Sequence, residues 1–192
     1  MPSSVASAPA GCQRPRGILT GHPRHYDGCM PREARGKTGR PTEARNKPER
    51  PRDHLGRPLP WDAEGTLHLE DYDAFSLEEN HRLGREHLNA GRFFPAHEAW
   101  ETAWKQARDT SEAEFFKGLS QLGAGYVHLL RGNAHGCVRL LRRGSGRVRR
   151  YPVGHQGVDT EAVAEAADRL AAAVERGEVV PGEQARFDPP VV

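Results

Sequence analysis

The chain has 192 residues, the size of one domain with room for a tail. Its hydrophobic fraction of 36% and mean hydropathy of −0.77 are low for a compact globule, and no apolar run is long enough to span a bilayer. The three cysteines have no metal-ligand spacing, and their odd number without an apolar secretory signal argues for reduced thiols in a cytosolic compartment. We therefore expect a cytoplasmic protein without a membrane partner.

The positive charge and the shortage of apolar residues are concentrated near the N-terminus. The first sixty residues hold twelve Lys and Arg but only five acids, so the remainder of the chain is mildly acidic. Residues 1–57 are rich in Pro, Gly, Arg and Ser, and burial there cannot offset the entropy lost on ordering. We predict a disordered basic tail at 1–57 and a folded domain at 58–192, with Trp61 as an anchor on the fold; whether translation starts at Met1 or Met30 stays open.

The first two helices are predicted from their start signals. Ser76 and Glu79 have the spacing of a capping box and predict a helix over residues 77–89, which Gly91 ends. Pro95 suits the first turn of a second helix that runs to about residue 108. The short connection predicts an antiparallel hairpin.

A second capping-box pattern, Ser111 to Glu114, predicts a third helix that ends at Arg131 and Gly132. It has one apolar stripe for the core and, beside that stripe, a line of small and polar residues. We expect this line to face the second helix, the glycines allowing a close approach; its members are Gly118, Gln121, Gly125 and His128.

Two further helices complete the predicted fold. Asn133 caps a fourth helix that Gly144 and Gly146 are expected to stop. Asp159 precedes an Ala-rich last helix, closed by Gly177. No glycine-rich phosphate loop or strand–helix alternation is present. The sequence therefore predicts an all-α bundle of about five helices.

The least ordinary combination of side chains lies in the stretch 93–104. At about 100° per residue, one face of the second helix carries His97, Trp100, Glu101 and Trp104. Apolar residues at this spacing normally face a core, so we expect His97 and Glu101 to enter the core beside the two indoles. A carboxylate buried without a partner is costly. Each of these polar groups must therefore have a definite partner.

Two interpretations of this face stay open. In a structural network, Glu101 accepts hydrogen bonds from a Trp indole, from His128 or from a cation such as Lys117, while the tryptophans fill the core. In a metal site, His97 and Glu101 share a divalent metal ion one turn apart on the helix, and His128 or Gln121 approaches from the third helix. The pattern differs from the HExxH zinc helix because Glu101 replaces the second histidine.

Three segments resemble those of the family known as domain of unknown function 309, which has an HExxExxW-type motif on one helix, a GLxQ segment on the next and an RGN turn. The matching residues are His97, Glu98, Glu101 and Trp104, then Gly118, Leu119 and Gln121, then Arg131, Gly132 and Asn133. The resemblance covers about residues 75–145. It implies a small helical bundle, common in prokaryotes, without an established activity.

Because no complete catalytic constellation is present, our leading hypothesis is a non-enzymatic binding or interaction module. Its binding residues would be Trp100, Glu101, Trp104, Gln121 and His128. Its partner would be a protein or a small molecule, and its last helix could form the contact of a homodimer. An alternative is a metal-dependent hydrolase with Glu98 as general base. A second alternative is a nucleic-acid accessory protein that uses the basic tail and the arginines at 139–150, although a solvated helix face is the better explanation of those arginines.

Overall fold

The computed structural model describes residues 50–192, so most of the tail predicted to be disordered at 1–57, its residues 1–49, lies outside this range. All described residues belong to one compact unit, Lys47–Val192. The five α-helices are α1 (Leu77–Asn89), α2 (Phe93–Gln106), α3 (Ala113–Leu130), α4 (Ala134–Val148) and α5 (Thr160–Glu175), and the two 3-10 turns are η1 (Tyr72–Ala74) and η2 (His155–Gly157). Within residues 50–192 there is no β-strand, so the all-α prediction is confirmed.

Side-chain caps fix three of the helix starts where the sequence places them. The Ser76 hydroxyl accepts from the backbone amide of Glu79, and the Glu79 carboxylate accepts from the backbone amide of Ser76. The capping box of α1 is therefore complete. Asn133 and Asp159 likewise accept from amides in the first turns of α4 and α5. The capping box predicted at Ser111 is wrong. No side chain caps α3, because the chain before it forms a turn in which the Ala113 amide bonds to the Thr110 carbonyl.

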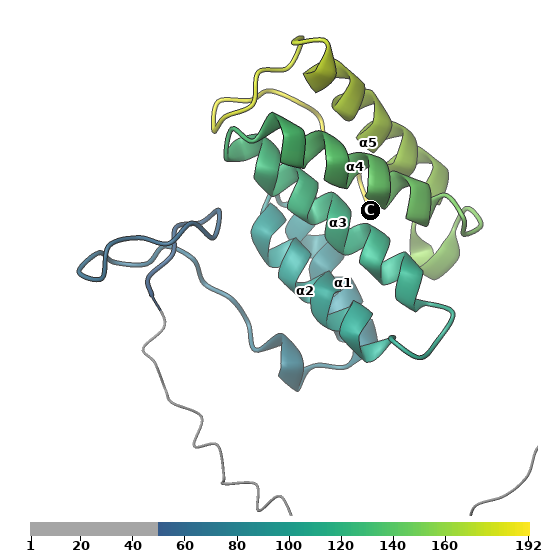
Figure 1. The fold of residues 1–192 in the computed structure, drawn as a ribbon. Coiled ribbons are helices and arrows are strands. Elements are labelled where there is room, and N and C mark those ends of the chain that lie inside the picture. Colours follow the sequence, from purple (N-terminus) through teal and green to yellow (C-terminus); the bar gives the residue numbers. More distant parts are fainter. Residues whose placement is uncertain (1–49) are drawn as a thin grey trace, which may run out of the picture. The chain divides into compact units, whose positions relative to one another are not determined.

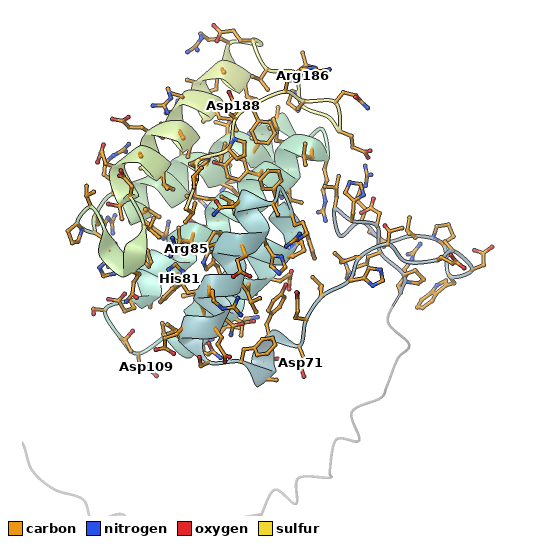
Figure 2. All side chains as sticks on the ribbon, turned by 180° about the vertical axis from the view of Figure 1, so that it is seen from behind. Asp71, His81, Arg85, Asp109, Arg186 and Asp188 are labelled. Carbon is orange, nitrogen blue, oxygen red and sulfur yellow. The ribbon has the colours of Figure 1, made fainter. Side chains whose placement is uncertain are left out.

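Each helix packs against the next along the chain, from α1 through to α5, as Figure 1 shows. The largest buried side chains come from the middle helices, among them Trp100, Phe115, Phe116 and Tyr126. Figure 2, the view from behind, shows Arg186 and Asp188 at the end of the bundle opposite Asp71 and Asp109. Within residues 50–192, no helix has the length and apolar character needed to cross a bilayer.

The prediction that Gly144 and Gly146 end the fourth helix is wrong, because α4 continues to Val148. A Cβ at position 144 would lie 2.7 Å from Leu122 and 2.9 Å from the Gly118 carbonyl oxygen of α3. Gly144 is therefore a point of close helix contact. Contact with a neighbouring helix, which the local sequence does not reveal, outweighs the low intrinsic helix propensity of glycine.

The segment before the helices is attached through a different residue from the one expected. Trp61 is 63% exposed, so the prediction that it anchors the segment is wrong. Leu55 is buried instead, and its carbonyl accepts a 3.0 Å hydrogen bond from Nε of Arg131 at the end of α3. At the other terminus, Phe187 stacks on Tyr126 with 5.6 Å between ring centroids. Both flanking segments thus pack on the bundle.

Candidate functional site

His97 is held on α2 by contacts to α3. Its Nδ1 lies 3.1 Å from the carbonyl oxygen and 3.0 Å from the hydroxyl of Ser120. A carbonyl oxygen can only accept, so the contact to it assigns the hydrogen to Nδ1. In the neutral ring, Nε2 then carries the lone pair. The close approach of the two helices depends on Gly123, where a Cβ would lie 3.0–3.2 Å from His97.

Nε2 of His97 faces two carboxylates from its own helix. It lies 3.4 Å from Oε2 of Glu101 and 3.9 Å from Oε1 of Glu98. One ligand atom from each of the three residues can be chosen so that all lie within 4.8 Å of one another. The three side chains are partly accessible to solvent, at 23%, 34% and 31% for His97, Glu98 and Glu101. A nitrogen lone pair and two carboxylates therefore converge at the surface of α2.

The expected burial of Glu101 in the core is wrong. Its other oxygen, Oε1, bonds Nζ of Lys105 at 3.0 Å, and no Trp indole donates to it. The reason is geometric, since Glu101 lies about 40° beyond His97 on the helix, on the side away from Trp100. His97 marks the edge between core and solvent, and Glu101 lies outside that edge.

The two tryptophans have different surroundings although they share a helix face. Trp100 is fully buried, and its Nε1–H donates to Nδ1 of His81 on α1 at 3.1 Å. Trp104 is half-buried, and the ammonium of Lys117 lies 4.7 Å from its ring centroid. Trp100 is therefore a core residue with a satisfied polar atom, and Trp104 takes part in a cation–π contact.

The small and polar line of α3 faces α4, and the expectation that it faces α2 is wrong. A Cβ on Gly125 would lie 2.8 Å from Leu141 of α4. Gln121 accepts a 3.1 Å hydrogen bond from Arg147 of α4, and Nδ1 of His128 lies 2.8 Å from the side-chain Nδ2 of Asn133. Neither Gln121 nor His128 belongs to the group formed by His97 and the two glutamates. Partial burial lowers the pKa of His128, and the charge of Arg131 lowers it further.

A family model described as domain of unknown function (DUF309) matches residues 81–140. This segment belongs to the DUF309 family. It spans α1 from His81 onward, all of α2 and α3, and α4 as far as Leu140. No curated protein and no solved structure matched the chain. The family description assigns no activity, so the function has to be argued from the site itself.

Two residues of the DUF309 segment that hold the site were missed by sequence reasoning. His81 is buried, and because its Nδ1 accepts from Trp100, its Nε2–H donates to the Gln156 carbonyl at 3.0 Å. Ser120 fixes the ring of His97. The burial of His81 could have been predicted, because His81 lies three and seven residues before Gly84 and Leu88 and so shares one face of α1 with them. No local signal distinguishes Ser120 from other polar residues on α3.

A second polar cluster lies where η1 meets the end of α1. Arg92 Nε donates to Nδ1 of buried His87 at 3.0 Å, so the other ring nitrogen, Nε2, carries the hydrogen of the neutral ring. Nε2 of His87 lies 3.1 Å from the Tyr72 hydroxyl and 3.3 Å from Oε2 of Glu70. The Tyr72 hydroxyl in turn donates to the same Glu70 oxygen at 2.7 Å. Burial lowers the pKa of His87 despite the nearby Glu70 carboxylate. Arg92 is therefore held by a chain of hydrogen bonds that ends at a carboxylate.

Three of the six arginines at 139–150 are paired with acids. Arg142 and Arg149 both bond Asp168 of α5, and Arg147 bonds Glu114 of α3. These pairs neutralise part of the charge that a nucleic-acid surface would need.

Proposed function

We propose that the helical bundle is a binding module for a divalent metal ion, with His97, Glu98 and Glu101 as its protein ligands. The observation that carries the proposal is the hydrogen bond from His97 Nδ1 to the Ser120 carbonyl, which directs the Nε2 lone pair toward the two carboxylates. Metal-ligating histidines commonly donate their other ring hydrogen to a carbonyl in this way. The proposal keeps His97 and Glu101 from the sequence-based ligand set and replaces His128 with Glu98.

The charges of the group favour a cation at its centre. A lone pair and two carboxylate oxygens repel one another unless a positive charge lies between them. Two ligands of a tetrahedral zinc ion at 2.0–2.2 Å from the metal are roughly 3.3–3.6 Å apart, and Nε2 lies 3.4 Å from Oε2 of Glu101. Imidazole with carboxylates suits Zn²⁺ or Mn²⁺, and water would complete the coordination. A proton on Nε2 would also satisfy the geometry and would make the group a structural ion-pair network.

Metal titration separates these two alternatives. We expect Zn²⁺ or Mn²⁺ to bind the metal-free protein in calorimetry and to raise its Tm, since a ligand that binds only the folded state stabilises it. His97→Gln, Glu98→Gln and Glu101→Gln should each weaken binding at least tenfold. Glu165→Gln is the matched control, because Glu165 pairs with Arg169 one turn on along α5 and lies outside the group. If neither metal binds, or if all four variants bind alike, the proposal is wrong.

Hydrolysis is a second candidate, favoured by the partial exposure of the three ligands, which leaves room for water on the metal. In that case His97 and Glu101 would hold the metal while Glu98 acts as general base. The test is turnover of p-nitrophenyl acetate or p-nitrophenyl phosphate with added Zn²⁺ or Mn²⁺. A hydrolase would lose turnover but keep metal binding in Glu98→Gln. Absence of turnover in the wild-type protein on both substrates would count against this candidate.

A homodimer through α5 remains a prediction. The side of α5 that carries Ala164, Ala167 and Ala171 is buried within the chain, so a dimer would have to use other residues of this helix. Size-exclusion chromatography with light scattering would decide it.

A further inference from the structure

We propose a second ligand site, independent of the metal site, that takes a small carboxylic acid with an apolar body. It is a cavity of about 320 Å³ between the segment before the helices and the start of α2. This volume lies at the lower end of the range for pockets that hold small organic ligands.

The wall of the cavity contributed by the preceding segment is held in place by hydrogen bonds. The amides of Thr66 and Leu67 both donate to the Arg52 carbonyl, at 2.9 and 3.2 Å, which closes the segment on itself. Leu55 is buried and is bonded through its carbonyl to Arg131. Leu55 and Leu67 face the cavity, so its apolar lining belongs to a fixed structure.

The opposite wall comes from the bundle and is apolar as well. It is formed by Phe93 and Pro95 of α2 together with Leu130 at the end of α3. Apolar surface on both sides indicates a ligand with an apolar body, because moving such a body out of water into an apolar environment is favourable.

The charges around the cavity indicate an acidic head group. The ionisable residues that line it are His54, His68 and Arg92, and none of its lining residues is acidic. Arg92 is positioned by the bond from its Nε to His87, and among residues 50–192 no carboxylate lies within 4 Å of its guanidinium. The two remaining nitrogens can therefore bond a carboxylate. The start of α2 adds to this preference, since no side chain caps it and its first turn holds no acid.

The test uses the full chain in the presence of EDTA, which keeps its outcome separate from the metal site. We expect sodium decanoate, kept below the concentration at which it forms micelles, to bind in calorimetry. Decan-1-ol has the same chain without the charge and should bind at least tenfold more weakly, and acetate, which lacks the apolar body, should not bind.

Two variants locate the binding. Leu67→Trp should fill the cavity and weaken decanoate at least tenfold, whereas Leu69→Trp, in the same segment but outside this cavity, should leave the affinity unchanged. Arg92→Gln should weaken decanoate at least fivefold and leave decan-1-ol unchanged, and Arg82→Gln is its exposed control on α1. No decanoate binding by the wild-type chain overturns the proposal, as does binding that both Leu67→Trp and Arg92→Gln leave intact.

Discussion

The indole Nε1–H of Trp100 donates to Nδ1 of His81 across 3.1 Å in the interior of the bundle, between α2 and α1. The other ring nitrogen of His81 donates to the carbonyl of Gln156, a non-glycine residue with φ of +50° in the loop before α5. One neutral imidazole thus joins α1, α2 and that loop. It also satisfies the buried indole of the candidate-site helix.

The first prediction concerns this histidine. His81→Leu removes the acceptor of the Trp100 indole and the donor to Gln156, so two buried polar groups lose their partners. We expect it to lower the free energy of unfolding by about 1–3 kcal/mol. His135→Leu, at an exposed position of α4, should change it by less than about 0.5 kcal/mol. Urea unfolding followed by circular dichroism measures both, and equal effects would show that the hydrogen bonds do not matter.

The second prediction compares two glycines within helices. A Cβ at Gly84 of α1 would lie 2.6 Å from the buried ring of Trp100, which has no room to move. Gly84→Ala should therefore destabilise the protein by about 1–3 kcal/mol, despite the better helix propensity of alanine. A Cβ at Gly146 of α4 would meet nothing within 4 Å, so Gly146→Ala should stabilise by about 0.5–1 kcal/mol. Changes in Tm of the same sign would contradict this interpretation.

Helix starts could be predicted from the sequence, whereas the role of a glycine within a helix could not. Capping side chains act on their own neighbours, so Ser76, Asn133 and Asp159 locate three helix starts from local pattern alone. A glycine inside a helix, such as Gly144, is indistinguishable by local pattern from one that ends a helix. The difference lies in the neighbouring helix, which the local sequence does not identify.

The candidate site, too, could be predicted only in part: its residues on α2 follow from the sequence, and their partner on α3 does not. His97, Glu98 and Glu101 come together because they lie on adjacent turns of one helix, which their spacing predicts. Their partner on α3 depends on how far α3 is rotated about its axis, and an error of about 100° in that angle, one residue, exchanges Ser120 for Gln121. The prediction therefore placed the polar line of α3 against α2, although it faces α4.

The third prediction is a pH dependence of stability. Burial lowers the pKa of His81, and it also lowers that of His87. In the unfolded chain these residues take up protons near pH 6.5, whereas in the folded protein they do so only at lower pH. The unfolded state therefore binds more protons between these values, and stability falls as the pH drops below about 6.5.

The expected slope is up to about 1.4 kcal/mol per pH unit for each of these histidines. The check is the free energy of unfolding in urea at pH 7.5 and pH 5.5. His87→Gln should reduce the difference between the two pH values, and His135→Gln, at an exposed position, should not. A stability that is unchanged or higher at pH 5.5 would contradict the assignment of neutral buried imidazoles.

The last prediction tests competition at the proposed metal site. The ammonium of Lys105 holds Oε1 of Glu101 at 3.0 Å, and a metal ion would be repelled by that charge and would compete for the same carboxylate. Lys105→Met keeps the apolar stem and removes the charge. It should raise the affinity for Zn²⁺ or Mn²⁺ by about 1.4- to 5-fold, since exposed ion pairs of this kind contribute about 0.2–1 kcal/mol.

Without metal, the same variant should change Tm only slightly. Lys117→Met is the matched control, because Lys117 lies over Trp104 and near Glu114 and does not pair with Glu101. Calorimetric titration of both variants and the wild-type protein measures the effect. Lower affinity in Lys105→Met would mean that the lysine orients Glu101 for binding, and equal gains in both variants would mean that a general change in surface charge is responsible.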